Sequence, residues 1–342
     1  MSIKKWPGAV VSDTPVVPAG PFQDGTASGV WTLDQVAYWQ KQGLWPVAGN
    51  VDPANRGIFG GGGSSSGNVN VIDYVSIMST GNASDFGDLT AARQALSACS
   101  SGTRGLFGGG YAGATIFNVI DYVTIASFGS ALDFGDLTLA RAELTACSSG
   151  TRGLFGGGEG SGGNVNIIDY VTIATTGNAL DFGDLLAAIR GLFGCASTTR
   201  GLFAGSSDTP NVIQYITIST TGNATDFGDL TVARYYGSSC SSGTRGLFGG
   251  GTTGASNSNV IDYVTIASTG NASDFGDLTA ATSGLAACSS SIRGVFGGGY
   301  PGDFTNTTSY VTISSAGNAT DFGDLTLSRS YLAACSNGHG GL

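Results

Sequence analysis

Lysine is missing from most of this chain, and histidine and glutamate are scarce. The three lysines (Lys4, Lys5 and Lys41) all lie in the first 50 residues. From residue 51 onward, 11 arginines face 21 acidic residues, which gives a net charge of −10. A lysine-free surface with excess negative charge repels phosphate groups, so nucleic acids and anionic membranes are disfavoured as partners.

Long apolar segments are missing as well. No apolar run approaches the roughly 18 residues of a membrane-spanning helix, and the first 20 residues lack the apolar core of a secretory signal. Four Asn-Ala-Ser/Thr triplets, at Asn82, Asn223, Asn271 and Asn318, match the glycosylation sequon. Without a secretory signal we interpret these triplets as turns.

The usual side chains of catalytic and metal sites are almost absent. His339 is the single histidine, so neither a Ser-His-Asp triad nor a histidine-containing metal site can be assembled. Glu143 and Glu159 are the only glutamates, and they are isolated in the sequence. We therefore predict no catalytic residue, no metal ligand, no cofactor and no enzymatic activity, and keep carboxylate-pair glycoside hydrolysis as an alternative.

What the chain has in abundance is repetition. Six near-copies of a unit of 45 to 48 residues run from Arg56 to the end, and each contains an RGLF-type block, a DFGDL block and one cysteine. The RGLF-type blocks begin at Arg56, Arg104, Arg152, Arg200, Arg245 and Arg293. The DFGDL blocks begin at Asp85, Asp133, Asp181, Asp226, Asp274 and Asp321. The cysteines are Cys99, Cys147, Cys195, Cys240, Cys288 and Cys335.

Each unit reads as four short strands without an amphipathic helix. In the second unit the segments 96–100, 106–110, 118–126 and 132–137 are rich in small, β-branched or aromatic residues and are separated by glycine-containing turns. Six such sheets around an axis form an all-β six-bladed β-propeller, and the 58 glycines suit strands crowded near that axis. A solenoid is the alternative, but neither terminal unit resembles a polar cap.

The phase of the two ends predicts how the ring closes. The repeats begin at a second strand (57–62) and end at an innermost strand (331–336), so one blade should combine both ends and leave no open sheet edge. The cysteines are expected to be reduced and buried, because equivalent positions around the ring lie near or beyond disulfide reach. For the DFGDL aspartates we expect structural roles, such as turn capping or pairing with the RGLF arginines.

The repeat resembles the kelch family. The run from Ala92-Arg93 through Leu96 and Cys99 to Leu106-Phe-Gly-Gly matches the kelch order of an arginine, a small-residue inner strand, a turn, an aromatic and a glycine doublet. The arginine of this run is Ile189 in the third copy and Thr282 in the fifth. The resemblance covers residues 56–342 and implies the propeller fold, but it says little about function.

The segment after the second strand varies most among the copies. These variable loops should emerge together on one face, and adaptable loops above a rigid scaffold are a common way to build a binding site. Four aromatic residues are expected to be exposed there as candidate ligand contacts: Tyr111, Phe117, Tyr300 and Phe304. The alternative is that the loops vary without binding anything.

Residues 1–55 form a separate N-terminal arm. It is proline-rich over 7–21, and its composition predicts a short helix at about 32–42, with Thr32 and Gln35 as a capping box. Its four tryptophans are candidate docking anchors: Trp6, Trp31, Trp39 and Trp45.

The segment SGVWTLDQVAYWQKQGLWP and the DYVTI…GNATDFGDLT repeats resemble structural proteins of tailed bacteriophages. This resemblance implies a virion location, with the arm (1–55) docking on other virion proteins and the propeller (56–342) as an adsorption or decoration module, present in multiple copies or as a homo-oligomer. A host surface glycan is the expected ligand. The alternatives are a purely structural collar, tail or head-fibre component without a ligand, and a glycan-degrading enzyme.

Overall fold

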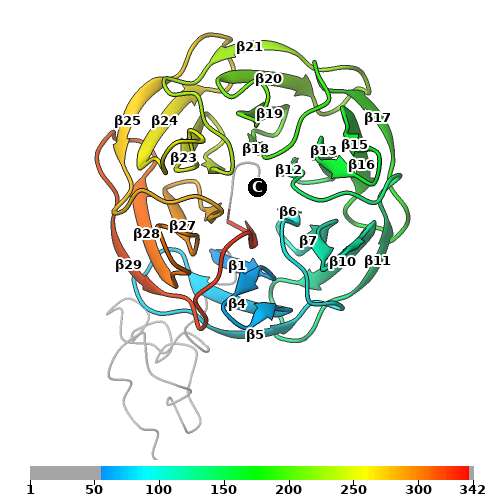
Figure 1. The fold of residues 1–342 in the computed structure, drawn as a ribbon, viewed down its shortest axis with the longest axis horizontal. Coiled ribbons are helices and arrows are strands. Elements are labelled where there is room, and N and C mark those ends of the chain that lie inside the picture. The colour runs from blue at the N-terminus through cyan, green and yellow to red at the C-terminus, as the bar shows by residue number, and fades with distance from the viewer. Residues whose placement is uncertain (1–54, 339–342) are drawn as a thin grey trace, which may run out of the picture. The chain divides into compact units, whose positions relative to one another are not determined.

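The computed structural model describes residues 55–338, which form six four-stranded antiparallel sheets around a central axis (Figure 1). The chain is therefore a six-bladed β-propeller, as the repeat predicts. The arm, with its predicted helix and its four tryptophans, lies outside the described residues. Within residues 55–338 no helix has the length and apolar character needed to cross a membrane.

We call the sheet that combines both ends blade 1 and number the others in chain order. The innermost strands of blades 1–6 are β30 (Ala333–Ser336), β6 (Ser97–Ser100), β12 (Thr145–Ser148), β18 (Phe193–Ala196), β22 (Ser238–Ser241) and β26 (Ala286–Ser289). The second strands are β1 (Arg56–Gly60), β7 (Arg104–Gly108), β13 (Arg152–Gly156), β19 (Arg200–Ala204), β23 (Arg245–Gly249) and β27 (Arg293–Gly297). The third strands are β4 (Val71–Ser76), β10 (Val119–Thr124), β16 (Ile167–Thr172), β20 (Val212–Thr217), β24 (Val260–Thr265) and β28 (Thr307–Thr312). The outer strands are β5 (Ser84–Asp88), β11 (Leu132–Asp136), β17 (Leu180–Asp184), β21 (Thr225–Asp229), β25 (Ser273–Asp277) and β29 (Thr320–Asp324).

Blade 1 closes the ring. The C-terminal strand β30 pairs antiparallel with β1 in the register Ile58↔Cys335 and Phe59↔Ala334, and β4 and β5 complete the sheet. The predicted closure is thus confirmed. The first strand, β1, begins at Arg56. Just before it, the carbonyl of Asn55 accepts a hydrogen bond from the backbone N–H of Ile77, which directly follows β4.

Buried arginine–aspartate pairs fasten four of the six inter-blade linkers. Arg93, in the linker from blade 1 to blade 2, contacts Asp121 of β10 at 3.0 Å, and both side chains are fully buried. Arg93 also donates to the Phe107 carbonyl, and Thr90 donates to Asp121. The other pairs are Arg141–Asp169, Arg234–Asp262 and Arg329–Asp73.

The two remaining linkers have lost both members of the pair. In blade 4, Ile189 and Gln214 stand at these positions, and in blade 6, Thr282 and Ser309. A buried charge without its partner is strongly unfavourable, so the arginine and the aspartate must be gained or lost together.

The RGLF arginines tie the blades together at the opposite end. Arg104 of blade 2 donates to the Ile173 carbonyl of blade 3 at 3.1 Å, and its guanidinium lies over the Tyr122 ring. The same bond recurs from each of the other five arginines to the next blade. Within residues 55–338 no ion pair joins these arginines to DFGDL aspartates, so that expected pairing is wrong: the arginines are already bound to carbonyls and tyrosine rings.

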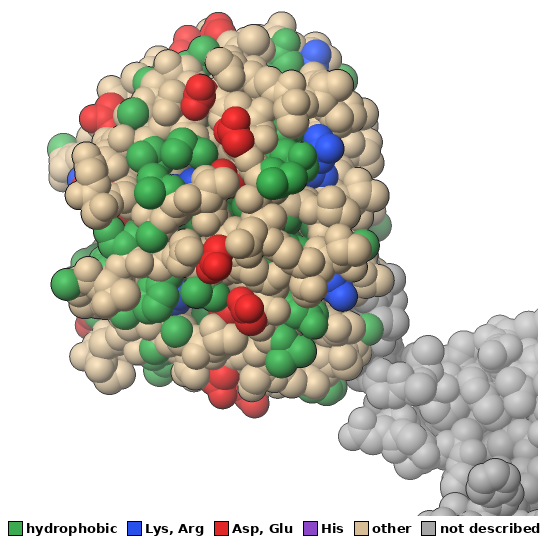
Figure 2. Space-filling view, turned by 90° about the vertical axis from the view of Figure 1, so that its right-hand side faces the viewer, with side chains coloured by type: hydrophobic (Ala, Val, Ile, Leu, Met, Phe, Trp, Pro, Cys, Tyr) green, Lys and Arg blue, Asp and Glu red, His purple; other side chains and the backbone are tan. Residues whose placement is uncertain are grey.

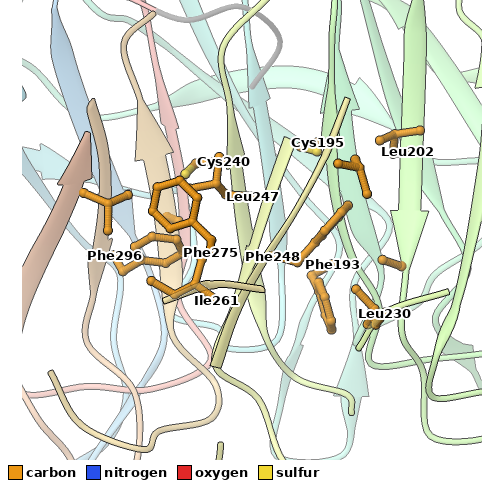
Figure 3. Close-up of a cluster of buried hydrophobic side chains, with 14 of the residues drawn as sticks. Phe193, Cys195, Leu202, Leu230, Cys240, Leu247, Phe248, Ile261, Phe275 and Phe296 are labelled. Atoms are coloured by element: carbon orange, nitrogen blue, oxygen red, sulfur yellow. The ribbon is translucent and has the colours of Figure 1, made fainter. Parts of the chain in front are cut away.

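Each cysteine fills a gap left by a glycine of the next blade. A Cβ on Gly153 of blade 3 would lie 2.7 Å from Cys99 Sγ of blade 2, and the same contact recurs around the ring. All six thiols are free and buried. Figure 3 shows Cys195 and Cys240 within one inter-blade cluster together with Leu247 and Phe248.

The outer wall of the ring carries the negative charge. The first aspartate of every DFGDL block is exposed on an outer strand, and Figure 2 shows acidic side chains spread over the wall. Turns on this wall clamp neighbouring blades, because Asn82 Oδ1 accepts a hydrogen bond from Asp324 N at 3.1 Å. Three further sequon asparagines make the equivalent bond: Asn223, Asn271 and Asn318.

Candidate functional site

Two kinds of connection meet at one end of every blade. In each blade, the loop between the second and third strands lies beside the linker that leads into the innermost strand of the same blade. Isolated bridges join this loop to the linker, as at Gln94↔Tyr111 and Ser283↔Tyr300. We call this end of the propeller the hairpin face. In three blades the loop is itself a hairpin: β2 (Gly63–Ser64) with β3 (Gly67–Asn68), β8 (Tyr111–Ala112) with β9 (Thr115–Ile116), and β14 (Glu159–Gly160) with β15 (Gly163–Asn164).

A closed ring of six backbone hydrogen bonds surrounds the axis on this face. Each linker contributes one residue whose N–H donates to the carbonyl of the equivalent residue in the preceding linker, over 2.6–2.9 Å. The six residues are Ala95, Glu143, Gly191, Tyr236, Gly284 and Tyr331.

All six ring residues adopt positive φ. Four of them are not glycine, with φ of 53–56°. This conformation costs an L-residue about 1–2 kcal/mol, and such strain gathers where the surrounding structure holds a functional group in place. The ring therefore presents its side chains around the axis in a fixed arrangement.

The charged side chains that break the repeat pattern converge beside this ring. Arg190 Nε lies 3.5 Å from Glu143 Oε2, and Arg190 Nη1 contacts Glu159 Oε2. Glu143 is on the ring, Glu159 begins β14, and Arg190 directly precedes the ring residue Gly191. One guanidinium thus joins both glutamates of the chain.

Tyrosine hydroxyls complete the cluster. Tyr236 Oη donates to Glu143 Oε2 at 2.5 Å, and the Tyr236 and Tyr331 rings meet edge to face with centroids 5.3 Å apart. Burial raises the pKa of Tyr236, and its bond to Glu143 acts in the same direction. Burial also raises the pKa of Tyr331 and Tyr111, with Glu143 adding to both shifts. The phenols therefore stay protonated and can donate hydrogen bonds.

A small cavity opens within the ring. It has a volume of about 60 Å³ and is lined by ring residues and by leucines such as Leu96 and Leu144. An axial space of about 90 Å³ lies among the innermost strands and is lined mainly by small side chains, together with Phe193 and five leucines. Glu143, Tyr236 and Tyr331 are the polar residues that line the smaller cavity, and hydroxyl and carboxylate groups of this kind suit a ligand rich in hydroxyl groups.

The four aromatic candidates all belong to the variable loops, but they differ in exposure. Tyr300 is 41% exposed and meets the half-buried Phe304 edge to face, with ring centroids 5.4 Å apart. Tyr111 is half-buried because its hydroxyl accepts a hydrogen bond from Gln94 at the linker. Phe117 is half-buried near the Arg93 guanidinium. Of these four candidates, Tyr300 alone is exposed.

Sequence reasoning missed the axial cluster. Glu143 and Glu159 are isolated in the sequence, whereas in the fold Arg190 contacts both. The sequence nevertheless carried a signal. Glu143 and Glu159 are the only glutamates, and Arg190 is the one arginine after residue 50 that lies neither in an RGLF block nor at the repeated linker position of Arg93. All three interrupt the repeat next to a linker or variable loop.

Comparison with known proteins gives no family assignment: no protein-family model matches the chain, and no curated protein is significantly similar to it.

Proposed function

We propose that the propeller is a non-enzymatic binding module whose hairpin face takes a neutral surface polysaccharide of a host cell. We further propose that the protein is a component of a tailed-phage particle, held there by residues 1–50. The observation that carries the binding proposal is the uneven distribution of departures from the repeat.

The inter-blade contacts of the walls and the opposite face repeat almost without change. All six RGLF arginines make the same inter-blade bond, and all six cysteines make the same contact with glycine. The hairpin face instead carries the changed loops and the Glu143–Arg190–Glu159 cluster. A purely structural ring has no need for such individual side chains at one end only.

Charge supports the same proposal. The acidic wall repels anionic polymers, which favours a neutral glycan.

The virion location rests on the sequence resemblance to phage structural proteins and on the tryptophan-rich arm. Trp6, Trp31, Trp39 and Trp45 would anchor the arm on neighbouring virion proteins. A collar, tail or head-fibre component without a ligand is the structural alternative.

A glycan-degrading enzyme is the second candidate, favoured by one observation. Glu143 and Glu159 form a carboxylate pair found at one place in the ring, as glycosidases require. Both carboxylates, however, are bound by the same arginine, and Glu143 also accepts the Tyr236 hydroxyl. This arrangement occupies the groups that would transfer protons, so binding is the better proposal.

The test is polysaccharide binding by the full chain and by Tyr300→Ala. We expect purified neutral bacterial surface polysaccharides to bind, and the variant to bind at least about tenfold more weakly, a loss of about 1.4 kcal/mol. Ile292→Ala is the matched control, because Ile292 is 50% exposed and lies in a connection on the opposite face. Equal binding by Y300A and I292A would contradict the proposal, whereas release of reducing ends that Glu143→Gln abolishes would favour the enzyme.

A further inference from the structure

Blade 6 contains a cavity where other blades hold a buried ion pair. In blade 3, for example, the corresponding space is filled by Arg141, which contacts Asp169 at 3.0 Å and donates to the Phe155 carbonyl. In blade 6 the two positions are Thr282 and Ser309, and a cavity of about 70 Å³ remains between the linker and the variable loop.

The cavity has an apolar floor and a hydroxyl-bearing wall. Leu278, Leu285 and Phe296 are buried along it, and Thr282, Thr305 and Ser309 contribute hydroxyls. Thr282 is 7% exposed, and its Oγ1 has no hydrogen-bond partner among the described residues. A buried hydroxyl without a partner costs about 1–3 kcal/mol. A ligand group that enters the cavity and forms a hydrogen bond with this atom would remove that cost.

The charge of the cavity restricts what can enter. Arginine and aspartate are both lost here, so a charged group would be buried without a counter-ion, which is strongly unfavourable. Hydroxyls both donate and accept, and they match the hydroxyl groups of a neutral ligand. The volume admits a few waters or one small substituent, because a single water occupies roughly 10–15 Å³ of such a cavity.

The loop beside the cavity supplies a surface for the rest of such a ligand. Pro301 and Thr305 line the opening, and the same short loop carries the perpendicular rings of Tyr300 and Phe304. An exposed aromatic ring offers an apolar face to the C–H side of a sugar, while the adjacent cavity is too small to hold a whole pyranose.

The geometry points to a monosaccharide subsite in blade 6. A neutral sugar stacks on Tyr300 and places its exocyclic hydroxymethyl group in the cavity, where it hydrogen-bonds to Thr282 Oγ1. This inference rests on the proposed glycan-binding function and deepens it by naming the subsite and the recognised group.

The chain itself provides the variants that test the subsite. Thr282→Arg/Ser309→Asp installs the pair used by four other linkers, and Thr279 is already in place to hydrogen-bond the introduced carboxylate, as Thr138 does with Asp169. Thr282→Ile fills the cavity without charge, in the manner of Ile189 in blade 4. This second variant keeps the test valid if the double variant folds poorly.

Blade 4 supplies the matched control. Ile189→Arg/Gln214→Asp introduces the same ion pair at the equivalent positions of a blade that lacks the Tyr300 loop. Folding of every variant is checked by its melting temperature.

The probes are the methyl glycosides of glucose, galactose, mannose and N-acetylglucosamine, and binding to the full chain is followed by saturation-transfer NMR. We expect at least one glycoside to bind, both cavity-filling variants to lose at least about tenfold in affinity, and the blade 4 control to bind as the unmodified protein does.

Two results would overturn the subsite. One is unchanged glycoside binding in the folded cavity-filling variants, which means that the cavity holds only water. If Y300A still weakens polysaccharide binding in that case, the proposed function stands and only the subsite fails. The other is the absence of binding to all four glycosides by the unmodified protein.

Discussion

Replacing Arg141 by isoleucine should destabilise the propeller severely. The change leaves the Asp169 carboxylate fully buried without its guanidinium, and the Phe155 carbonyl loses a donor. Removing one member of a buried pair costs about 3–5 kcal/mol. An unfolding entropy of ~2.1 cal/mol/K per residue amounts to about 0.6 kcal/mol/K for residues 55–338, so the melting temperature should fall by roughly 5–8 °C.

The compensating variant is Arg141→Ile/Asp169→Gln, which copies blade 4. There Ile189 is buried and Gln214 Oε1 accepts a hydrogen bond from Leu186 N at 2.8 Å. Because replacing both members of a buried pair by well-packed groups is often nearly neutral, the double variant should recover most of the loss.

Denaturation of the unmodified protein, both single variants and the double variant gives the coupling free energy of the pair through a double-mutant cycle. We expect a coupling of at least about 2 kcal/mol. A double variant as unstable as R141I, or an R141I protein that melts like the unmodified one, would refute the reasoning.

Three further predictions concern closure, thiols and the arm. Deleting residues 330–342 removes β30 and should abolish cooperative unfolding, whereas melting like the full chain would show that blade 1 does not lock the ring. Burial raises the pKa of Cys147 and Cys335 from 9.0 to about 12, so the unfolded state loses protons that the folded state keeps. The unfolding free energy should therefore fall as pH rises from 9 towards 12, and six thiols should react with a thiol reagent only in denaturant; an unchanged free energy, or four or fewer thiols, would contradict this. Removing residues 1–50 should leave a soluble propeller that no longer enters particles, and normal incorporation would refute docking through the arm.

The ring, its blade number and its closure could be predicted because they depend on period and phase, which every copy repeats.

For the arginine–aspartate pairs, the comparison of the copies identified the arginine but not the aspartate. The loss of arginine at Ile189 and Thr282 is evident in the alignment of the copies, but its partner lies in another segment. The parallel loss of aspartate at Gln214 and Ser309 was the signal that would have identified the pair.

The axial cluster was harder to predict, because its members come from different segments. Glu143, Glu159 and Arg190 meet only once the linkers have turned inward and β14 has formed beside them. Strand patterns carry no information on such linker geometry. The exposure of individual loop residues could not be predicted either. Tyr111, for example, accepts a hydrogen bond from Gln94 that no local sequence pattern indicates.

The pairing of β30 with β1 also has a mechanical consequence. A pull on the chain before Asn55 acts along β1, which lies between β30 and β4 and is bonded to both. Force applied along a strand loads its backbone hydrogen bonds in shear, so many must break at once instead of opening one after another. If the arm docks on a particle and the hairpin face binds a surface, drag on the particle would therefore load β1, a strand that is paired on both edges.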